Sequence, residues 1–299
     1  MKKLRVVVSL PNDNAYQHQQ AVVAKSTGEL LGLELQVFHA NDDAITQSQQ
    51  LLQCIQSRPE NRPHALLVEP VTATGLRRVA EAAVTEGIAW VISNSDVNYI
   101  RELAKTSKVP VFTVSQGQNE IGRLQGKQMT SLLPQGGNVL TIEGPGLSSV
   151  AVQRHEGMET ARQRNLQLTM LRSKWSEDSA AQSVGAWLKL ATSRPDKYHL
   201  IAGQTHELAL GARKAFQAVN NSELTQKWLA LPFIGVGIAN QVKPLVDRRI
   251  FAAAVVTSVT MELALRLLVG ALESKIQPPE RSVVDVASYP ELEKLTPKL

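Results

Sequence analysis

The chain of 299 residues contains 43% hydrophobic and 20% charged residues. This composition is typical of a globular protein and excludes an intrinsically disordered chain. The net charge of +5 is spread along the sequence, and no block of Lys or Arg indicates a surface for nucleic acid or lipid. Cys54 is the single cysteine, which excludes an intramolecular disulfide and a thiolate metal cluster.

The first residues bear on location. Met1, Lys2 and Lys3 imitate the charged start of a signal peptide, but the apolar stretch 6–10 ends at Pro11. An export core needs roughly 7–15 apolar residues, and no stretch elsewhere approaches the length of a membrane span. We therefore expect a cytoplasmic protein as the chain is written, without membrane insertion. A periplasmic location is the alternative if an export signal has been removed.

Short apolar segments, rich in β-branched residues, alternate with segments of helical periodicity. In the first half, we expect strands at 5–10, 33–40, 64–70, 88–94 and 109–115, and helices at 17–31, 44–56, 74–87 and 97–107. In the second half, we expect strands at 138–144, 168–174, 199–204, 232–237, 251–258 and 281–288, and helices at 119–133, 150–164, 177–192, 206–219, 239–248 and 259–274. The alternation predicts an α/β fold of two Rossmann-like lobes, each with a parallel sheet covered by helices on both faces.

Two of these strands, 109–115 and 251–258, run into the opposite half without a turn signal. The chain is therefore expected to cross between the lobes three times, at strands that act as a hinge. These crossings are expected near Gln116, Thr257 and residues 281–287. Lobe one then comprises 1–116 and 257–285, lobe two comprises 117–256 and 286–299, and a ligand cleft lies between them.

Ligands of such folds bind beyond the carboxyl ends of the strands. The residues expected there combine hydrogen-bonding groups with two aromatic rings, which suits a small polar or polyhydroxylated ligand whose C–H face stacks on a ring. The candidate ligand-binding residues are Asn14, Tyr16, Gln17, Glu69, Asn94, Ser95, Arg154, Trp175, Thr205, His206 and Thr257.

Five motifs in order carry a family resemblance: VVVSLPNDNAYQ, HALLVEP, SSVAVQRHEGM, SKWSED and IAGQTHELALGARKAFQ. The chain, from about 4 to 290, resembles the type I periplasmic binding proteins. It is most similar to the ribose-binding-protein-like group, which is related to the ligand domain of lactose-repressor-type regulators. The resemblance implies a binding protein whose lobes close on a sugar. The chain departs from the family pattern by having Glu69 where Asn or Asp is usual, and His206 and Gly237 where members that bind aldoses carry a carboxylate or amide, so ribose is not the expected ligand.

By this resemblance, Arg154 points into the cleft and holds ligand oxygens through its planar set of donors. The alternative is a solvated surface arginine. Trp175 is expected to stack on the ligand, or otherwise to pack between the lobes. Glu69 is expected to pair with Arg154 or a ligand donor, or to be solvated at the rim. Replacing Arg154 or Trp175 by Ala is expected to weaken binding and to leave the melting temperature of the ligand-free protein nearly unchanged.

The expected function is non-catalytic binding of a carbohydrate or sugar-like polyol by lobe closure, as the substrate-binding component of an ABC-type transporter with a membrane permease as partner. A cytoplasmic ligand-sensing protein that signals through a partner is the alternative. No phosphate-loop, dinucleotide or nucleophile-elbow motif occurs, and the six histidines lack metal-binding spacing, so we expect no enzyme, cofactor or metal. No helix-turn-helix precedes the first strand, so no nucleic-acid partner is expected.

Overall fold

The computed structural model of the protein describes residues 3–72, 74–274 and 276–297. The chain forms two compact units. The first contains Met1–Gly117 and Val259–Val284, and the second contains Gln118–Ser258 and Asp285–Leu299. The chain passes from one unit to the other after Gly117, Ser258 and Val284. Thr257, which the sequence analysis assigns to lobe one, therefore lies in the second unit.

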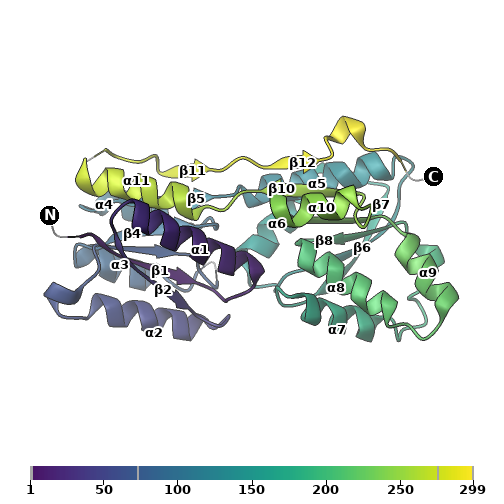
Figure 1. Cartoon of the computed structure of the whole chain (residues 1–299), viewed down its shortest axis with the longest axis horizontal. Helices are drawn as coiled ribbons and strands as arrows, with labels where there is room; N and C mark the ends of the chain where they lie inside the picture. Colours follow the sequence, from purple (N-terminus) through teal and green to yellow (C-terminus); the bar gives the residue numbers. More distant parts are fainter. Residues whose placement is uncertain (1–2, 73, 275, 298–299) are drawn as a thin grey trace. The chain divides into compact units, whose positions relative to one another are not determined.

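The first unit is built on a sheet with the strand order β11-β5-β4-β3-β1-β2, in which every neighbouring pair is parallel (Figure 1). Its strands are β1 (Arg5–Leu10), β2 (Glu34–His39), β3 (Ala65–Val68), β4 (Ala89–Ser93), β5 (Val111–Ser115) and β11 (Arg281–Val283). Its helices are α1 (Ala15–Leu30), α2 (Ala44–Ile55), α3 (Arg77–Thr85), α4 (Ile100–Thr106) and α11 (Met261–Glu273).

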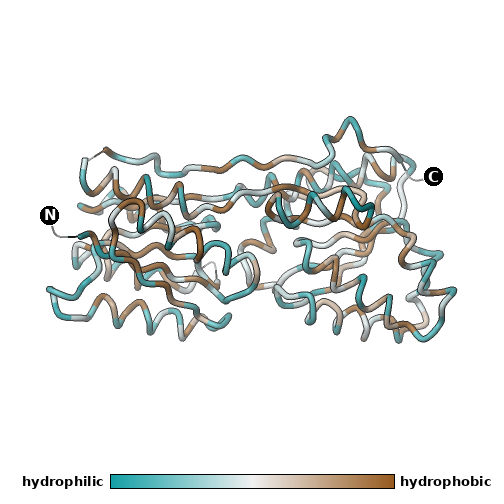
Figure 2. Tube along the Cα trace, viewed as in Figure 1, coloured by the Kyte–Doolittle hydropathy of each residue, from teal (hydrophilic) through white to brown (hydrophobic). Residues whose placement is uncertain are grey.

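Helices cover both faces of this sheet. Leu51 of α2, Val79 of α3 and Leu103 of α4 pack with one set of strand residues, whereas Ala24 of α1 and Leu265 of α11 pack with the alternate set. Since successive strand side chains point to opposite faces, strands buried on both sides are apolar over most of their length. Figure 2 shows the strands as hydrophobic stretches.

The sheet of the second unit has the order β12-β10-β9-β8-β6-β7, parallel except for the antiparallel pair of β10 and β12. Its strands are β6 (Gly137–Glu143), β7 (Leu166–Arg172), β8 (Leu200–Gly203), β9 (Phe233–Ile238), β10 (Ala253–Thr257) and β12 (Ala287–Tyr289). Its helices are α5 (Gln118–Leu132), α6 (Ser149–Ala161), α7 (Glu177–Trp187), α8 (His206–Gln217), α9 (Ser222–Ala230) and α10 (Ala239–Asp247).

Helices α5 and α6 pack on one face of this sheet at very close range. A Cβ added to Gly157 of α6 would lie 2.0 Å from the carbonyl oxygen of Asn119 in α5, and one added to Gly122 of α5 would lie 2.0 Å from the carbonyl oxygen of Arg154. Only glycine allows the two backbones to approach this closely. The other face is covered by α7, α8 and α9, whose Val184, Phe216 and Trp228 are buried.

The structure differs from the sequence prediction in two elements. The single strand expected at 281–288 is two strands: β11 pairs in parallel with β5 of the first sheet, and β12 pairs antiparallel with β10 of the second. Helix α9 was not predicted, because residues Ser222–Lys227 are mostly polar. Only Trp228, near the end of the helix, is buried. Among the described residues, no helix has both the length and the apolar character to span a bilayer.

Candidate functional site

Three predicted site residues lie together beyond the carboxyl ends of neighbouring strands in the first sheet. Glu69 follows β3, Asn94 follows β4, and Gln17 lies in the first turn of α1, which follows β1. The Glu69 Oε1 atom accepts hydrogen bonds from Nε2 of Gln17 and from Nδ2 of Asn94, both at 2.8 Å. All three side chains are buried. We call Gln17, Glu69 and Asn94 the amide–carboxylate cluster.

The cluster presents acceptor atoms. Both side-chain amides direct one N–H group to the carboxylate, and Oε1 of Gln17 is buried with no hydrogen-bond partner among the described residues. A buried acceptor without a partner costs about 1–3 kcal/mol, so an incoming hydroxyl or ammonium donor would recover that cost. The cluster therefore suits a ligand that donates hydrogen bonds.

A residue that sequence reasoning missed holds the loop after β3. Nε2 of Gln47 in α2 donates to the carbonyl oxygen of Glu69 at 2.8 Å, and its Oε1 accepts from the backbone N–H of Val71 at 2.9 Å. Asn94 has a φ of 58°, a left-handed conformation that asparagine tolerates better than most residues. Both features fix the backbone from which the cluster projects.

Asn14 positions the start of α1. Its Oδ1 accepts from the backbone N–H of Gln17 at 3.0 Å, so its side chain caps the helix that carries Tyr16 and Gln17. Ser95 is buried directly after Asn94. The Tyr16 hydroxyl accepts hydrogen bonds from two buried amides that the sequence analysis did not identify as site residues, Nε2 of Gln20 at 2.9 Å and Nε2 of Gln116 at 2.8 Å.

In the second unit, Arg154 lies in the middle of α6 and is 6% exposed, so it is not a solvated surface arginine. Its Nε donates to Oε1 of Gln118, the first residue of α5, at 2.8 Å, and its Nη1 donates to the carbonyl oxygen of Gln204 after β8. The Gln204 side chain in turn accepts from the N–H of Gly144 and donates to the carbonyl of Ala151. Arg154 thus joins α5, α6 and the end of β8 within this unit.

Trp175 lies between β7 and α7 and is half-buried. A Cβ added to Gly144, which follows β6, would lie 2.2 Å from Cζ2 of the indole. The indole therefore occupies space that a side chain at position 144 would fill. The ring also packs against the core residues of α7 and α8. The indole is held in a defined position at the carboxyl end of the strands.

Thr205 and His206 begin α8. The Thr205 Oγ1 accepts from the backbone N–H of Leu208 at 3.2 Å, which makes Thr205 the helix cap. His206 is buried, its Nδ1 lies 3.3 Å from the carbonyl oxygen of Val236, and burial lowers the pKa of its imidazole. Thr257 ends β10 and is buried.

A carboxylate that sequence reasoning missed also lies in this unit. Glu143 ends β6 and is 1% exposed, and its Oε1 lies 2.8 Å from Nδ1 of His155 in α6. The sequence does not predict this pair, because a glutamate next to a glycine in TIEG is typical of a solvent-exposed strand end. Among the described residues, this pair included, no group of three or more His, Cys, Asp or Glu side chains could hold a metal ion.

The family model described as "Periplasmic binding protein domain" matches residues 6–275. The chain belongs to this family. A search of curated protein sequences returned no significant match.

Solved structures agree with this family in fold. An ABC transporter periplasmic solute-binding protein from Actinobacillus succinogenes with bound D-allose is 16% identical, with a TM-score of 0.80 over 98% of this chain and 99% of that chain. The Caulobacter myo-inositol binding protein is 19% identical, with a TM-score of 0.79 over 95% of this chain and 92% of that one. The fructose-binding periplasmic domain of a hybrid two-component system is 18% identical, with a TM-score of 0.77 over 95% of this chain and 90% of that one.

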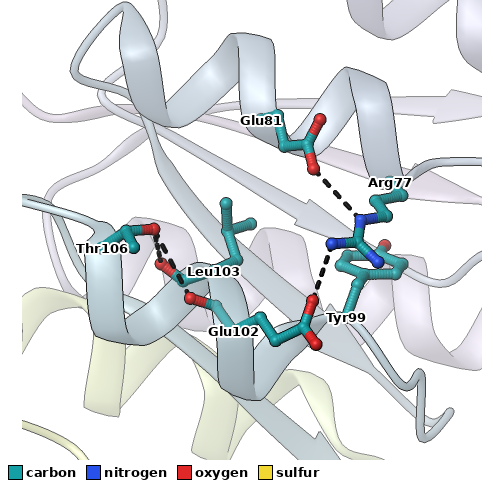
Figure 3. A pocket seen from close by; sticks show the side chains of 6 residues that line it. All are labelled: Arg77, Glu81, Tyr99, Glu102, Leu103 and Thr106. Carbon is teal, nitrogen blue, oxygen red and sulfur yellow. Dashed lines mark hydrogen bonds and ion pairs between the residues drawn. The ribbon is translucent and has the colours of Figure 1, made fainter.

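The periplasmic binding protein domain also carries a surface pocket that contains none of the predicted site residues. It has a volume of about 200 Å³ and lies between α3 and α4 of the first unit. Arg77 extends across it and donates to Glu81 at 3.1 Å and to Glu102 at 2.6 Å, with Tyr99 and Leu103 beside it (Figure 3). The two carboxylates are exposed, and the arrangement is an ion-pair bridge between two helices.

Proposed function

We propose that the protein binds a small neutral carbohydrate or sugar-like polyol without chemically transforming it. The observation that carries this proposal is the amide–carboxylate cluster, in which Oε1 of Gln17, buried without a hydrogen-bond partner among the described residues, lies in the same buried cluster as the Glu69 carboxylate, at the carboxyl ends of neighbouring strands. A polyol is rich in hydroxyl donors, which these acceptors would bind. Asn14, Tyr16 and Ser95 extend the proposed contact surface of the first unit.

We propose that the second unit contributes Arg154, Trp175, Thr205, His206 and Thr257 to the same ligand. The half-buried indole of Trp175 offers a flat apolar surface for the C–H face of a sugar ring. Arg154 keeps the planar donor group that suits ligand oxygens, although two of its nitrogens also bond within its own unit. Binding by residues of both units would couple ligand uptake to closure of the lobes.

The proposed biological role is that of the substrate-binding component of an ABC-type transporter, with a membrane permease as partner. Two of the structural neighbours named above, those described with D-allose and myo-inositol, are binding proteins for sugars or polyols. This role requires the protein to work outside the cytoplasmic membrane.

A thermal-shift screen with D-allose, D-fructose, L-arabinose, D-galactose and myo-inositol tests the binding proposal, because a ligand that binds the native state raises its melting temperature. For a compound that binds, Glu69→Gln should weaken the affinity about tenfold or more by calorimetry, since hydrogen bonds to a charged group are worth about 1.5–3 kcal/mol. Glu29→Gln, at an exposed position of α1, is the matched control and should bind normally. The proposal fails if no neutral sugar or polyol stabilises the protein.

A ligand-sensing role is the second candidate. The structural neighbour from a hybrid two-component system is a fructose-binding domain of a signalling protein, which favours this possibility. Affinity purification from the native host separates the two roles. Co-purification with a membrane permease supports transport, whereas co-purification with a signalling partner and no permease supports sensing.

A further inference from the structure

The hydroxyl of Tyr16 lies at the centre of a buried hydrogen-bond network in the first unit. It accepts from Nε2 of Gln20, one turn further along α1, and from Nε2 of Gln116, which is 100 residues away in the sequence. Gln20 and Gln116 are buried. The ring of Tyr16 is therefore anchored through its polar end, which leaves the face of the ring as the part that a ligand would contact.

Gln20 uses every hydrogen-bonding position of its side chain. Besides Tyr16, its Nε2 donates to Oγ1 of Thr260 at 2.9 Å, and its Oε1 accepts from the backbone N–H groups of Thr260 at 3.1 Å and Met261 at 3.3 Å. These N–H groups begin α11 and have no acceptor within that helix. The Oγ1 atom of Thr260 also lies 2.6 Å from Oγ of Ser93 at the end of β4.

The partners of Tyr16 and Gln20 lie where the chain connects the two units. Gln116 immediately precedes the passage out of the first unit after Gly117, and Thr260 immediately follows the return at Val259. The third connection, which follows Val284, is bonded to the first, which follows Gly117. The backbone N–H of Val284 donates to the carbonyl oxygen of Ser115 at 2.9 Å. A single aromatic hydroxyl thus bonds directly or through one glutamine to two of the three connections.

We propose that Gln20 is a positioning residue that links the ring of Tyr16 to the segments connecting the two units, so that ligand contact at the ring changes the stability of those segments. When the ring moves, Nε2 of Gln20 and Nε2 of Gln116 each lose the hydrogen bond to the Tyr16 hydroxyl, and the loss of a buried hydrogen bond is unfavourable. The position of the ring and the order of the connecting segments are therefore coupled. The ligand-facing role of Tyr16 rests on the proposed function, whereas the link itself rests on the hydrogen bonds.

Amide hydrogen exchange of the ligand-free protein tests the link. Tyr16→Phe keeps the ring and removes the acceptor. We expect exchange at Thr260 and Met261, and in the segment 115–118, to become about tenfold faster, while β3 and β4 exchange at the wild-type rate. Tyr99→Phe is the matched control, because it removes a buried tyrosine hydroxyl of the same unit that has no hydrogen bond to a connecting segment among the described residues. The control should leave both segments unchanged.

Wild-type exchange at both segments in Tyr16→Phe would overturn the proposal, and so would an equal acceleration in Tyr99→Phe. Gln116→Met provides a second variant that removes the donor and keeps the volume, and it should accelerate exchange at 115–118. A uniform acceleration that includes β3 and β4 would show a general loss of stability and also contradict the link. If none of the five compounds of the thermal-shift screen binds, the proposed function fails, yet this ligand-free comparison still decides the link.

Discussion

The two units place polar side chains at the carboxyl ends of their strands in different ways. In the first unit, side chains from three loops bond to one another, as Glu69 does with Gln17 and Asn94. In the second unit, the predicted residues bond largely to local structure: Thr205 caps α8, and Arg154 donates to the backbone of Gln204. A polar residue at a strand end can therefore serve a ligand, the fold, or both.

The motifs that carry the family resemblance follow the same division. In SSVAVQRHEGM, Gly157 is required for the close approach of α5 and α6. In the stretch around Ala209 and Leu210, a Cβ on Gly211 would lie 2.3 Å from the carbonyl oxygen of Glu177 in α7. These motif glycines serve helix packing, so the motifs indicate the fold more strongly than the ligand.

Gly157→Ala should produce the largest effect and tests the packing side of the comparison. Its methyl group would meet the Asn119 carbonyl oxygen, and separating two helix backbones costs about 3 kcal/mol or more. We expect a large drop in melting temperature. Gly185→Ala in α7 is the control, because no atom of the described residues would lie within 4 Å of an added Cβ there. Helix propensity should make that variant slightly more stable. Equal melting temperatures for both variants would contradict the packing explanation.

Arg154→Ala is the next test, and the structure changes the expectation drawn from the sequence. The guanidinium is buried and joins three elements, so its removal leaves Gln118 and the carbonyl of Gln204 without this donor. We expect the ligand-free protein to lose about 2–3 kcal/mol of stability, in addition to weaker ligand binding. Arg164→Ala, at an exposed position after α6, should melt like the wild type. An unchanged melting temperature for Arg154→Ala would contradict the structural role of Arg154 and leave only its proposed role in ligand binding.

The sequence predicted the elements well where the hydrophobic pattern is local. All strands of the two sheets except β11 and β12 lie within two residues of their expected bounds, because a buried parallel strand is a short apolar run with a clear start and end. The prediction of a single strand at 281–288 was wrong for a physical reason. Its alternating pattern is continuous in the sequence, but its two ends pair with strands of different sheets.

The site was predictable to the extent that strand ends define it. Glu69, Gln17 and Asn94 are brought together because β1, β3 and β4 are neighbours in the sheet. Gln20 and Thr260 could not have been paired, since they are 240 residues apart and a glutamine on a helix carries no signal of a distant partner. Such pairings depend on the tertiary arrangement of α1 and α11.

Trp175→Ala sharpens the comparison, because the second unit uses this ring for packing as well as for the proposed stacking. The indole rests on Gly144 and the α7 and α8 core, so its loss should destabilise the ligand-free protein by about 1–2 kcal/mol. Trp175→Phe keeps an aromatic surface and should retain most of that stability. For a sugar identified by the thermal-shift screen, calorimetry should show weaker binding to the alanine variant than to the phenylalanine variant. Identical binding to both variants would exclude stacking at this position.

The smallest expected effect is the pH dependence that His206 adds to the second unit. Burial lowers the pKa of this imidazole from its ordinary value of 6.5, although the Val236 carbonyl partly opposes the shift. The folded state therefore favours the neutral ring, and the associated stability is present above pH 6.5 and is lost as the pH falls through the folded pKa. Between pH 8 and pH 5, the melting temperature of the wild type should fall more than that of His206→Asn, because the asparagine side chain does not titrate. His18→Asn, on the exposed side of α1 in the first unit, should follow the wild type, and a reversed or absent difference for His206→Asn would show that this ring is not buried in its neutral form.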